Sequence, residues 1–220
     1  MPRSKKTNQR PARRRAGTAA TLDEAIDALK AGELVVYPTE TFYALGADPL
    51  SNAALAKLFG AKARDPANPV ALIAADLASA FGFAREVPPV ARRLAEMFWP
   101  GALTLVLPAR EGLAPELIGP GGGVGVRVSP HPIACALAAG LGHPVTATSA
   151  NQAGAAPARN VAEARAALGA KVKVYLEGGA LAADAPSTVV EVQAHQWTVL
   201  REGAISMSQL AAALGQQVLE

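Results

Sequence analysis

The stretch KARDPANPVALIAAD, residues 62–76, places two cations just before a run that is typical of a buried strand. Side chains two residues apart on an extended backbone point to the same side, so we expect Lys62 and Arg64 to face one way. If that side is a cleft, the pair predicts a site for an anion. Two cations held together without a ligand repel one another, so alanine at either position should leave stability nearly unchanged.

The composition is that of a globular protein of moderate size. Half of the 220 residues are hydrophobic, which is enough for a full core. No apolar run approaches the roughly 18 residues of a membrane span, and the basic start is not followed by the apolar segment of a secretory signal. Cys135 is the only cysteine, which excludes an internal disulfide and a thiolate metal site. We therefore expect a cytoplasmic protein.

The net charge of +3 conceals an uneven distribution. Seven of the 21 Lys and Arg residues lie in the first 15 positions, and no acid precedes Asp23. From Ala16 onward the chain carries 14 basic and 18 acidic residues, a net charge of −4. Residues 1–17 are predicted to form a disordered basic tail. Such a tail either aids solubility or holds RNA phosphates by counterion release.

Strand-like and helical runs predict an α/β fold with a mixed sheet in one folded unit, residues 18–220. Thr21 and Glu24 have the pattern of a capping box, and Ser51 is a second candidate helix cap. STVVEV and QWTVLREG are separated by only a few residues and predict an antiparallel hairpin. Further strands are expected in ELVVYP and VKVYLEG and at 70–75, 102–107, 123–128 and 144–148, and helices near 88–97, 131–141, 160–168 and in SMSQLAAAL.

The residues suited to chemistry lie in loops that follow strands. TSAN, residues 148–151, would point Ser149 and Asn151 to one side, and YPTETFYALG, residues 37–46, carries two threonines after a strand. The glycine run GPGGGVG, residues 119–125, could cradle a phosphate, although such clusters are more often plain turns. No metal-ligand spacing, reactive cysteine or P-loop is present. Each motif alone is a weak signal, since these residue types are common in turns.

Together, the ordered motifs resemble the YrdC-like family of threonylcarbamoyl-AMP synthases. The resemblance runs from about Leu34 to Gly203. It rests on KxR at 62–64, NPV at 68–70 and SxN at 149–151, with YPTETFYALG, WPGALTLVL, GVGVRV followed by His131-Pro132, PSTVV and LREG in order.

The resemblance implies a twisted mixed sheet around a large basic cavity in a single YrdC-like domain. It also implies a nucleotidyl transfer: L-threonine, bicarbonate and ATP give threonylcarbamoyl-AMP and pyrophosphate. The product would feed the modification of tRNA to threonylcarbamoyladenosine by a threonylcarbamoyl transferase complex. Larger members carry an additional C-terminal domain, for which this chain ends too early.

Family analogy also assigns roles to residues. Lys62 and Arg64 would be catalytic and contact the triphosphate, with Arg201 adding a planar fork. The threonine would face Thr39, Asn68 and Ser187, and the nucleotide would face Thr104, Ser149 and Asn151. Mg²⁺ held mainly by the ATP phosphates needs no cage of protein ligands.

Four positions depart from the family pattern. Ala44 stands where glycine is usual, and Asp65, Ala102 and Ser129 stand where proline is usual. They leave open a divergent paralogue, acting either on a substrate other than threonine or as an RNA-binding module. Intact KxR and SxN favour the enzyme, and the arginine-rich tail favours RNA binding. The acidic excess of the rest of the chain argues against broad RNA contact.

Overall fold

The computed structural model describes residues 20–65, 67–194 and 196–215, and the basic tail predicted at residues 1–17 lies outside them. Within the described residues, nine strands form one sheet. They are β1 (Val35–Tyr37), β2 (Ala44–Gly46), β3 (Ala71–Ala74), β4 (Leu103–Pro108), β5 (Gly123–Val128), β6 (Val145–Ser149), β7 (Val174–Tyr175), β8 (Thr188–Gln193) and β9 (Gln196–Arg201).

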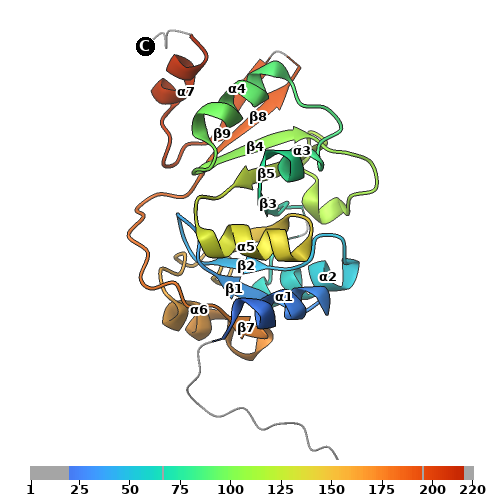
Figure 1. The fold of residues 1–220 in the computed structure, drawn as a ribbon, viewed down its shortest axis with the longest axis vertical. Helices are drawn as coiled ribbons and strands as arrows, with labels where there is room; N and C mark the ends of the chain where they lie inside the picture. Colours follow the sequence, from blue (N-terminus) through green and yellow to red (C-terminus); the bar gives the residue numbers. More distant parts are fainter. Residues whose placement is uncertain (1–19, 66, 195, 216–220) are drawn as a thin grey trace, which may run out of the picture.

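The sheet is mixed, as the sequence predicts. The strands follow the order β7-β1-β2-β6-β3-β5-β4-β8-β9, and this order runs along the long dimension of the molecule (Figure 1). Three neighbouring pairs are parallel and five are antiparallel. The predicted hairpin is confirmed, because β8 and β9 pair antiparallel with Val192 opposite Trp197.

Helices cover both faces of this sheet. They are α1 (Leu22–Lys30), α2 (Asn52–Lys62), α3 (Leu77–Phe81), α4 (Pro89–Phe98), α5 (Pro132–Leu141), α6 (Val161–Leu168) and α7 (Met207–Ala213), with short 3₁₀ turns η1 (Pro115–Leu117) and η2 (Gly169–Lys171). One face packs on α1 and α5, where Tyr37, Ile73 and Leu137 share a core. The other face packs on α2 and α6 around Leu45, and on α3, α4 and α7 around Leu105.

Short-range signals set the starts of the first two helices. The Thr21 side chain accepts a hydrogen bond from the backbone N of Glu24 at 3.2 Å, and Glu24 Oε2 accepts one from the backbone N of Thr21 at 2.9 Å. Ser51 Oγ accepts from the backbone N of Ala54 at 3.3 Å. These bonds satisfy N–H groups that the first turn of a helix leaves without partners, so both predicted caps are confirmed.

Helix α2 continues to Lys62, so the prediction of an extended backbone through Lys62 and Arg64 is wrong. Ala63 takes the left-handed conformation, with a φ of 48°, and ends the helix. The two cations therefore leave the chain from a helix end and from the loop after it. Strand β2 and helix α3 were not predicted, because three and five residues are too few to show a period.

None of the helices in the described residues combines the length and the apolar character needed to cross a membrane.

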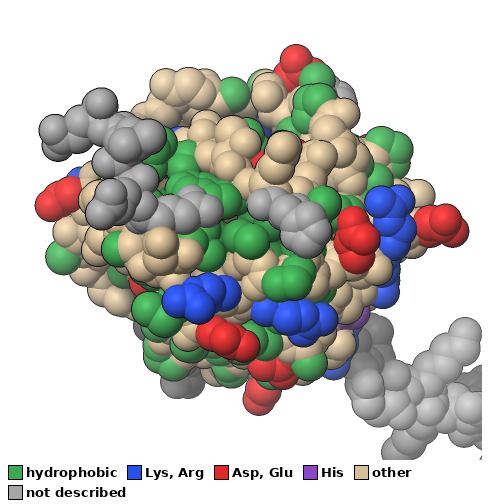
Figure 2. Space-filling view, turned by 90° about the horizontal axis from the view of Figure 1, so that it is seen from above, with side chains coloured by type: hydrophobic (Ala, Val, Ile, Leu, Met, Phe, Trp, Pro, Cys, Tyr) green, Lys and Arg blue, Asp and Glu red, His purple; other side chains and the backbone are tan. Residues whose placement is uncertain are grey.

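Charges are mixed on the end of the molecule that carries α7. Apolar side chains occupy the middle of this face, and acidic and basic side chains lie around them (Figure 2). Met97 on α4 and Met207 on α7 are 60% and 42% exposed. Neither sign of charge dominates this surface.

Small residues leave a hollow on the face that carries α5. Ala147 on β6 pairs with Ala71 on β3, and a Cβ added at Gly125 on β5 would meet the Cβ of Ala71 at 3.3 Å. The same row continues through Val106 on β4 to Glu191 on β8. The side chains of Ala71 and Ala147, and the absence of one at Gly125, cannot fill the space beside α5, so this part of the sheet stays open.

Candidate active site

A cavity of about 710 Å³ lies over this hollow, a size typical of small-molecule sites. Its walls come from the loop after β1, the glycine loop 119–123, and strands on both sides of β5. Six of the predicted site residues line it: Thr39, Arg64, Thr104, Ser149, Ser187 and Arg201. The structure does not place the other three in the lining: Lys62, Asn68 and Asn151.

Arg127, which the sequence reasoning missed as a site residue, is a buried cation that lines the cavity. Its Nη1 lies 2.7 Å from Glu40 Oε1 and 3.4 Å from Thr41 Oγ1. Among the described residues, nothing accepts a hydrogen bond from its Nε or Nη2. These N–H groups are therefore available to a ligand. A lone arginine in the otherwise apolar strand GVGVRV was the signal that could have found it.

A row of polar groups crosses β4, β8 and β9 next to Arg127. Thr104 Oγ1 and Ser187 Oγ lie 2.9 Å apart. Arg201 donates from Nε and Nη2 to the carbonyl of Ser187, at 3.3 and 2.8 Å. Burial, together with the neighbouring Arg127, lowers the pKa of Arg201. This row offers hydroxyls and one guanidinium edge to the cavity.

Arg64 is fixed in the opposite wall by its own loop. Its Nε donates to the carbonyl of Asn68 at 2.8 Å, its Nη2 to the carbonyl of Pro69 at 2.9 Å, and its Nη1 to Thr148 Oγ1 at 3.4 Å. Burial lowers the pKa of Arg64. The guanidinium is therefore held in one plane before any ligand binds. Asn68 contributes a backbone carbonyl to this arrangement.

Lys62 occupies an interior position beside the cavity, with 2% of its surface exposed. Its ammonium group donates to the carbonyl of Ser149, to the carbonyl of Asn151 at 2.8 Å and to Asn151 Oδ1 at 2.9 Å. Burial, with a smaller effect of Arg64, lowers the pKa of Lys62 to about 8, so the group stays protonated at neutral pH. All three N–H groups are used. The predicted contact with ATP would need one of these bonds to break.

Asn151 joins Lys62 to the rest of the TSAN loop. Its Oδ1 also accepts from Ser149 Oγ at 2.6 Å, and its Nδ2 donates to the carbonyl of Ala155. Ser149 itself reaches the cavity. The KxR and SxN motifs thus meet in space. One member of each motif lines the cavity, and the other holds the loop in place.

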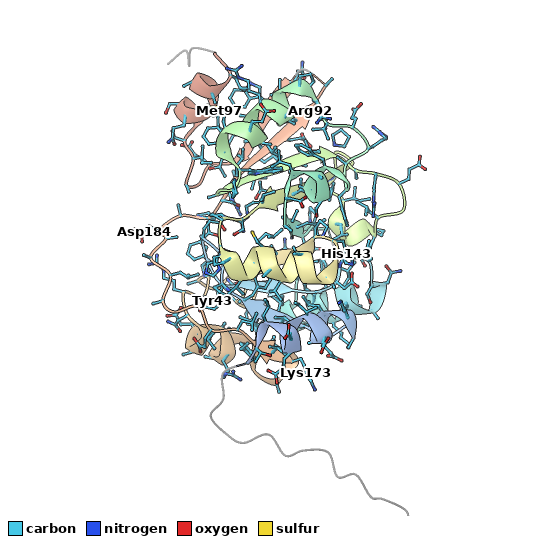
Figure 3. The ribbon with its side chains drawn as sticks, viewed as in Figure 1. Tyr43, Arg92, Met97, His143, Lys173 and Asp184 are labelled. Atoms are coloured by element: carbon cyan, nitrogen blue, oxygen red, sulfur yellow. The ribbon has the colours of Figure 1, made fainter. Side chains whose placement is uncertain are left out.

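The loop after β1 forms the remaining polar wall. Thr39 Oγ1 donates to the carbonyl of Phe42 at 2.7 Å and accepts from the backbone N of Thr41 at 3.1 Å. Tyr43, labelled in Figure 3, donates its hydroxyl to the carbonyl of Gly179 at 2.8 Å and accepts from the backbone N of Gly178 at 2.9 Å. These bonds fix a turn that would otherwise be free to move.

Ser129, one of the departures from the family pattern, takes part in this wall. Its Oγ donates to Glu40 Oε2 and accepts from the backbone N of His131 at 3.1 Å. Glu40 is therefore held between Ser129 and Arg127, and it fixes the guanidinium from one side only.

The fold and the cavity define an α/β protein whose site gathers three arginines suited to an anionic small molecule, with no Cys or His in the lining of the cavity as described. The chain belongs to the Sua5/YciO/YrdC family: the model of that family, whose description is "Telomere recombination", matches residues 27–203. The resemblance inferred from the motifs is confirmed.

Individual relatives agree with this assignment. A threonylcarbamoyl-AMP synthase of Chromohalobacter salexigens is 40% identical over 177 residues, which are 80% of this chain and 95% of the relative. The crystal structure of P. abyssi Sua5 complexed with L-threonine is 32% identical, with a TM-score of 0.84 over 89% of this chain and 57% of that chain. E. coli YciO is 27% identical, with a TM-score of 0.77 over 86% of this chain and 92% of that chain.

Proposed function

We propose that this protein is a threonylcarbamoyl-AMP synthase, a nucleotidyltransferase that acts on L-threonine, bicarbonate and ATP. The observation that carries the proposal is the buried Arg127, which keeps Nε and Nη2 free for a ligand between two further arginines of the cavity. Relatives of that name that cover most of the chain support it.

The chemistry needs positioning and charge neutralisation. Bicarbonate first carboxylates the neutral threonine amine with loss of water, and a carboxylate oxygen of this carbamate then attacks the α-phosphorus of ATP. The bond from that phosphorus to pyrophosphate breaks. Two anions must meet, so cations held in place lower the barrier and no protein nucleophile is needed. Arg64, Arg127 and Arg201 suit this task.

We assign neighbouring groups of cavity residues to the two substrates, which would meet where the Thr104 and Ser187 hydroxyls lie 2.9 Å apart. Thr39 and Ser187 would hold the threonine, whose crystal complex with the P. abyssi relative supports an amino-acid site in this fold. Thr104 and Ser149 would face the nucleotide. Lys62 and Asn151 would act mainly by shaping the walls, because their side-chain polar groups bond to the protein. Asn68 supports Arg64 through its backbone carbonyl, and its exposed side chain would be available to the threonine.

Mg²⁺ would enter as its complex with ATP. The described residues hold no group of three or more His, Cys, Asp or Glu side chains that could bind an ion by themselves. Phosphate oxygens and water satisfy the octahedral preference of Mg²⁺ with little help from protein ligands. The ion would neutralise charge on the leaving pyrophosphate.

The decisive experiment measures pyrophosphate release by the purified protein. We expect release from ATP only when L-threonine and bicarbonate are both present, because the carbamate is the nucleophile. Serine in place of threonine tests the fit around Thr39. Equal turnover with serine, or without any amino acid, would contradict the substrate assignment and favour another carbamoyl-adenylate chemistry.

A cytoplasmic role in tRNA modification follows from this activity. Threonylcarbamoyl-AMP would pass to a threonylcarbamoyl transferase complex that modifies certain tRNAs. The adenylate is a reactive mixed anhydride, so the transferase should act close to its source.

The basic tail favours RNA binding as a second function, in addition to synthesis. Seven Lys and Arg residues in the first 15 positions would contact phosphates. The end face that carries α7 mixes both signs of charge (Figure 2), so a broad basic surface is not found there.

Deleting residues 1–15 should leave adenylate formation intact and should flatten the salt dependence of RNA affinity. For each RNA phosphate that the shortened protein no longer neutralises, the slope of log affinity against log salt should become shallower by about 0.7 to 0.9 units. RNA affinity measured from low to high salt checks this result. Identical slopes for both proteins would show that the tail does not bind RNA.

A further inference from the structure

The cavity contains one carboxylate among the residues described in its lining, that of Glu191 on β8. The charged groups otherwise are Arg64, Arg127 and Arg201. A carboxylate repels phosphate, so an acid in a site built for anions is expected to face a part of the ligand other than its phosphates. The position of Glu191 therefore indicates which part of the cavity does not hold the phosphates of the ligand.

Glu191 lies away from the Arg201 guanidinium along β8. Ser187 and Glu191 are four residues apart, roughly 13 Å along an extended backbone at about 3.3 Å per residue. Arg201 is opposite Val189, between them, but its guanidinium donates to Ser187 and so points away from Glu191. Phosphates held by Arg201 and Arg127 would leave the nucleoside half of ATP pointing toward Glu191.

The surroundings of Glu191 suit a nucleoside. Its strand neighbour Val106, the nearby Val189 and the half-exposed Leu200 are apolar and line the same cavity. The glycine loop 119–123 forms the facing wall. This loop was considered as a phosphate cradle in the sequence, but a carboxylate beside it argues against that use. Flat apolar walls with one acceptor fit an uncharged, planar group.

The carboxylate of Glu191 is held against the glycine loop. A Cβ added at Gly121 would lie 2.9 Å from Glu191 Oε1, which leaves no room for a larger residue unless the carboxylate moves. Among the described residues, no Lys or Arg pairs with Glu191. Its oxygens are therefore available to accept hydrogen bonds from a ligand.

We propose that Glu191 is a specificity-determining residue that accepts a hydrogen bond from the nucleoside half of ATP. The donor is an uncharged N–H or O–H group, either the exocyclic amine of adenine or the ribose 2′-hydroxyl. This inference rests on the proposed use of ATP. It adds a polar contact at the end of the cavity farthest from the phosphates.

The direction in which Glu191→Gln changes the affinity for ATP tests the proposal. If Glu191 only repels the anion, Glu191→Gln should tighten ATP binding. If Glu191 accepts a hydrogen bond, the same change should weaken ATP binding by about tenfold or more, the scale for a bond to a charged group. Calorimetric titration with ATP measures the dissociation constant, and thermal unfolding checks that each variant is folded. Glu96→Gln on the exposed surface of α4 is the matched control and should bind ATP like the wild type.

Two analogues identify the donor. Purine riboside triphosphate lacks the exocyclic amine, and 2′-deoxy-ATP lacks a ribose hydroxyl. The penalty of Glu191→Gln should vanish with one of them, because the bond is then already missing. Gly121→Ala keeps the charge but displaces the carboxylate, and it should reproduce the same pattern.

Two results would overturn the proposal: tighter or unchanged ATP binding by Glu191→Gln, or an undiminished penalty with both analogues. If the wild type makes pyrophosphate from threonine and ATP while either result is found, only the role of Glu191 fails. If the wild type binds no ATP, the proposed function fails with it.

Discussion

Replacing Lys62 by methionine should lower the free energy of unfolding by about 2–5 kcal/mol, because the change leaves buried carbonyl groups without partners. The ammonium group serves the carbonyls of Ser149 and Asn151 and the side chain of Asn151. Methionine fills a similar volume but donates nothing. Each unsatisfied buried acceptor costs about 1–3 kcal/mol. Urea unfolding of both proteins measures the difference.

Lys57→Met is the matched control for this measurement. Lys57 lies on the same helix and pairs with Glu33 at 2.8 Å, but the two side chains are 45% and 39% exposed. An exposed pair contributes about 1 kcal/mol or less, so this variant should remain close to the wild type. A Lys62→Met protein that unfolds like the control would show that the interior bonds of Lys62 contribute little, and that its role lies with the ligand.

This expectation reverses the one drawn from the sequence, where alanine at Lys62 was expected to leave stability nearly unchanged. The error lay in the backbone conformation predicted for residues 62–64. An extended chain would present Lys62 and Arg64 as one cationic face, but α2 runs through Lys62 and turns its side chain inward. The stop signal in the sequence is Pro66, three residues after Ala63, which indicates a nearby helix end without fixing it at Lys62.

Other elements were predictable because their causes are local. The capping box at Thr21 and the short connection between β8 and β9 depend on residues a few positions apart. The family motifs predicted the fold and six of the residues that line the cavity. Arg127 was missed, since its importance depends on Glu40 and Thr41, some 86 positions away or more. Long-range pairing decides which buried charge faces a ligand, and a single sequence does not reveal that pairing.

The second large effect is expected at Arg127. Arg127→Lys should reduce threonine-dependent pyrophosphate release by roughly 100-fold or more, the scale of losing one preorganised electrostatic contact. Lysine keeps the charge beside Glu40, so the fold should survive, whereas removal of the charge would leave that carboxylate buried and unpaired. Lysine lacks the planar guanidinium. In Arg127, Nη1 contacts Glu40 and Thr41, and Nε and Nη2 remain available to a ligand in the cavity.

The comparison that isolates this geometry is Arg110→Lys. Arg110 stacks over Phe83, with its guanidinium carbon 4.4 Å from the ring centre, and is not part of the cavity lining. Its replacement should leave turnover near that of the wild type. Steady-state rates at saturating and limiting ATP separate a loss of binding from a loss of turnover. A wild-type rate in Arg127→Lys would mean that charge alone suffices there. The fixed guanidinium plane would then have to be supplied by Arg64, whose three protein contacts already hold it in the opposite wall.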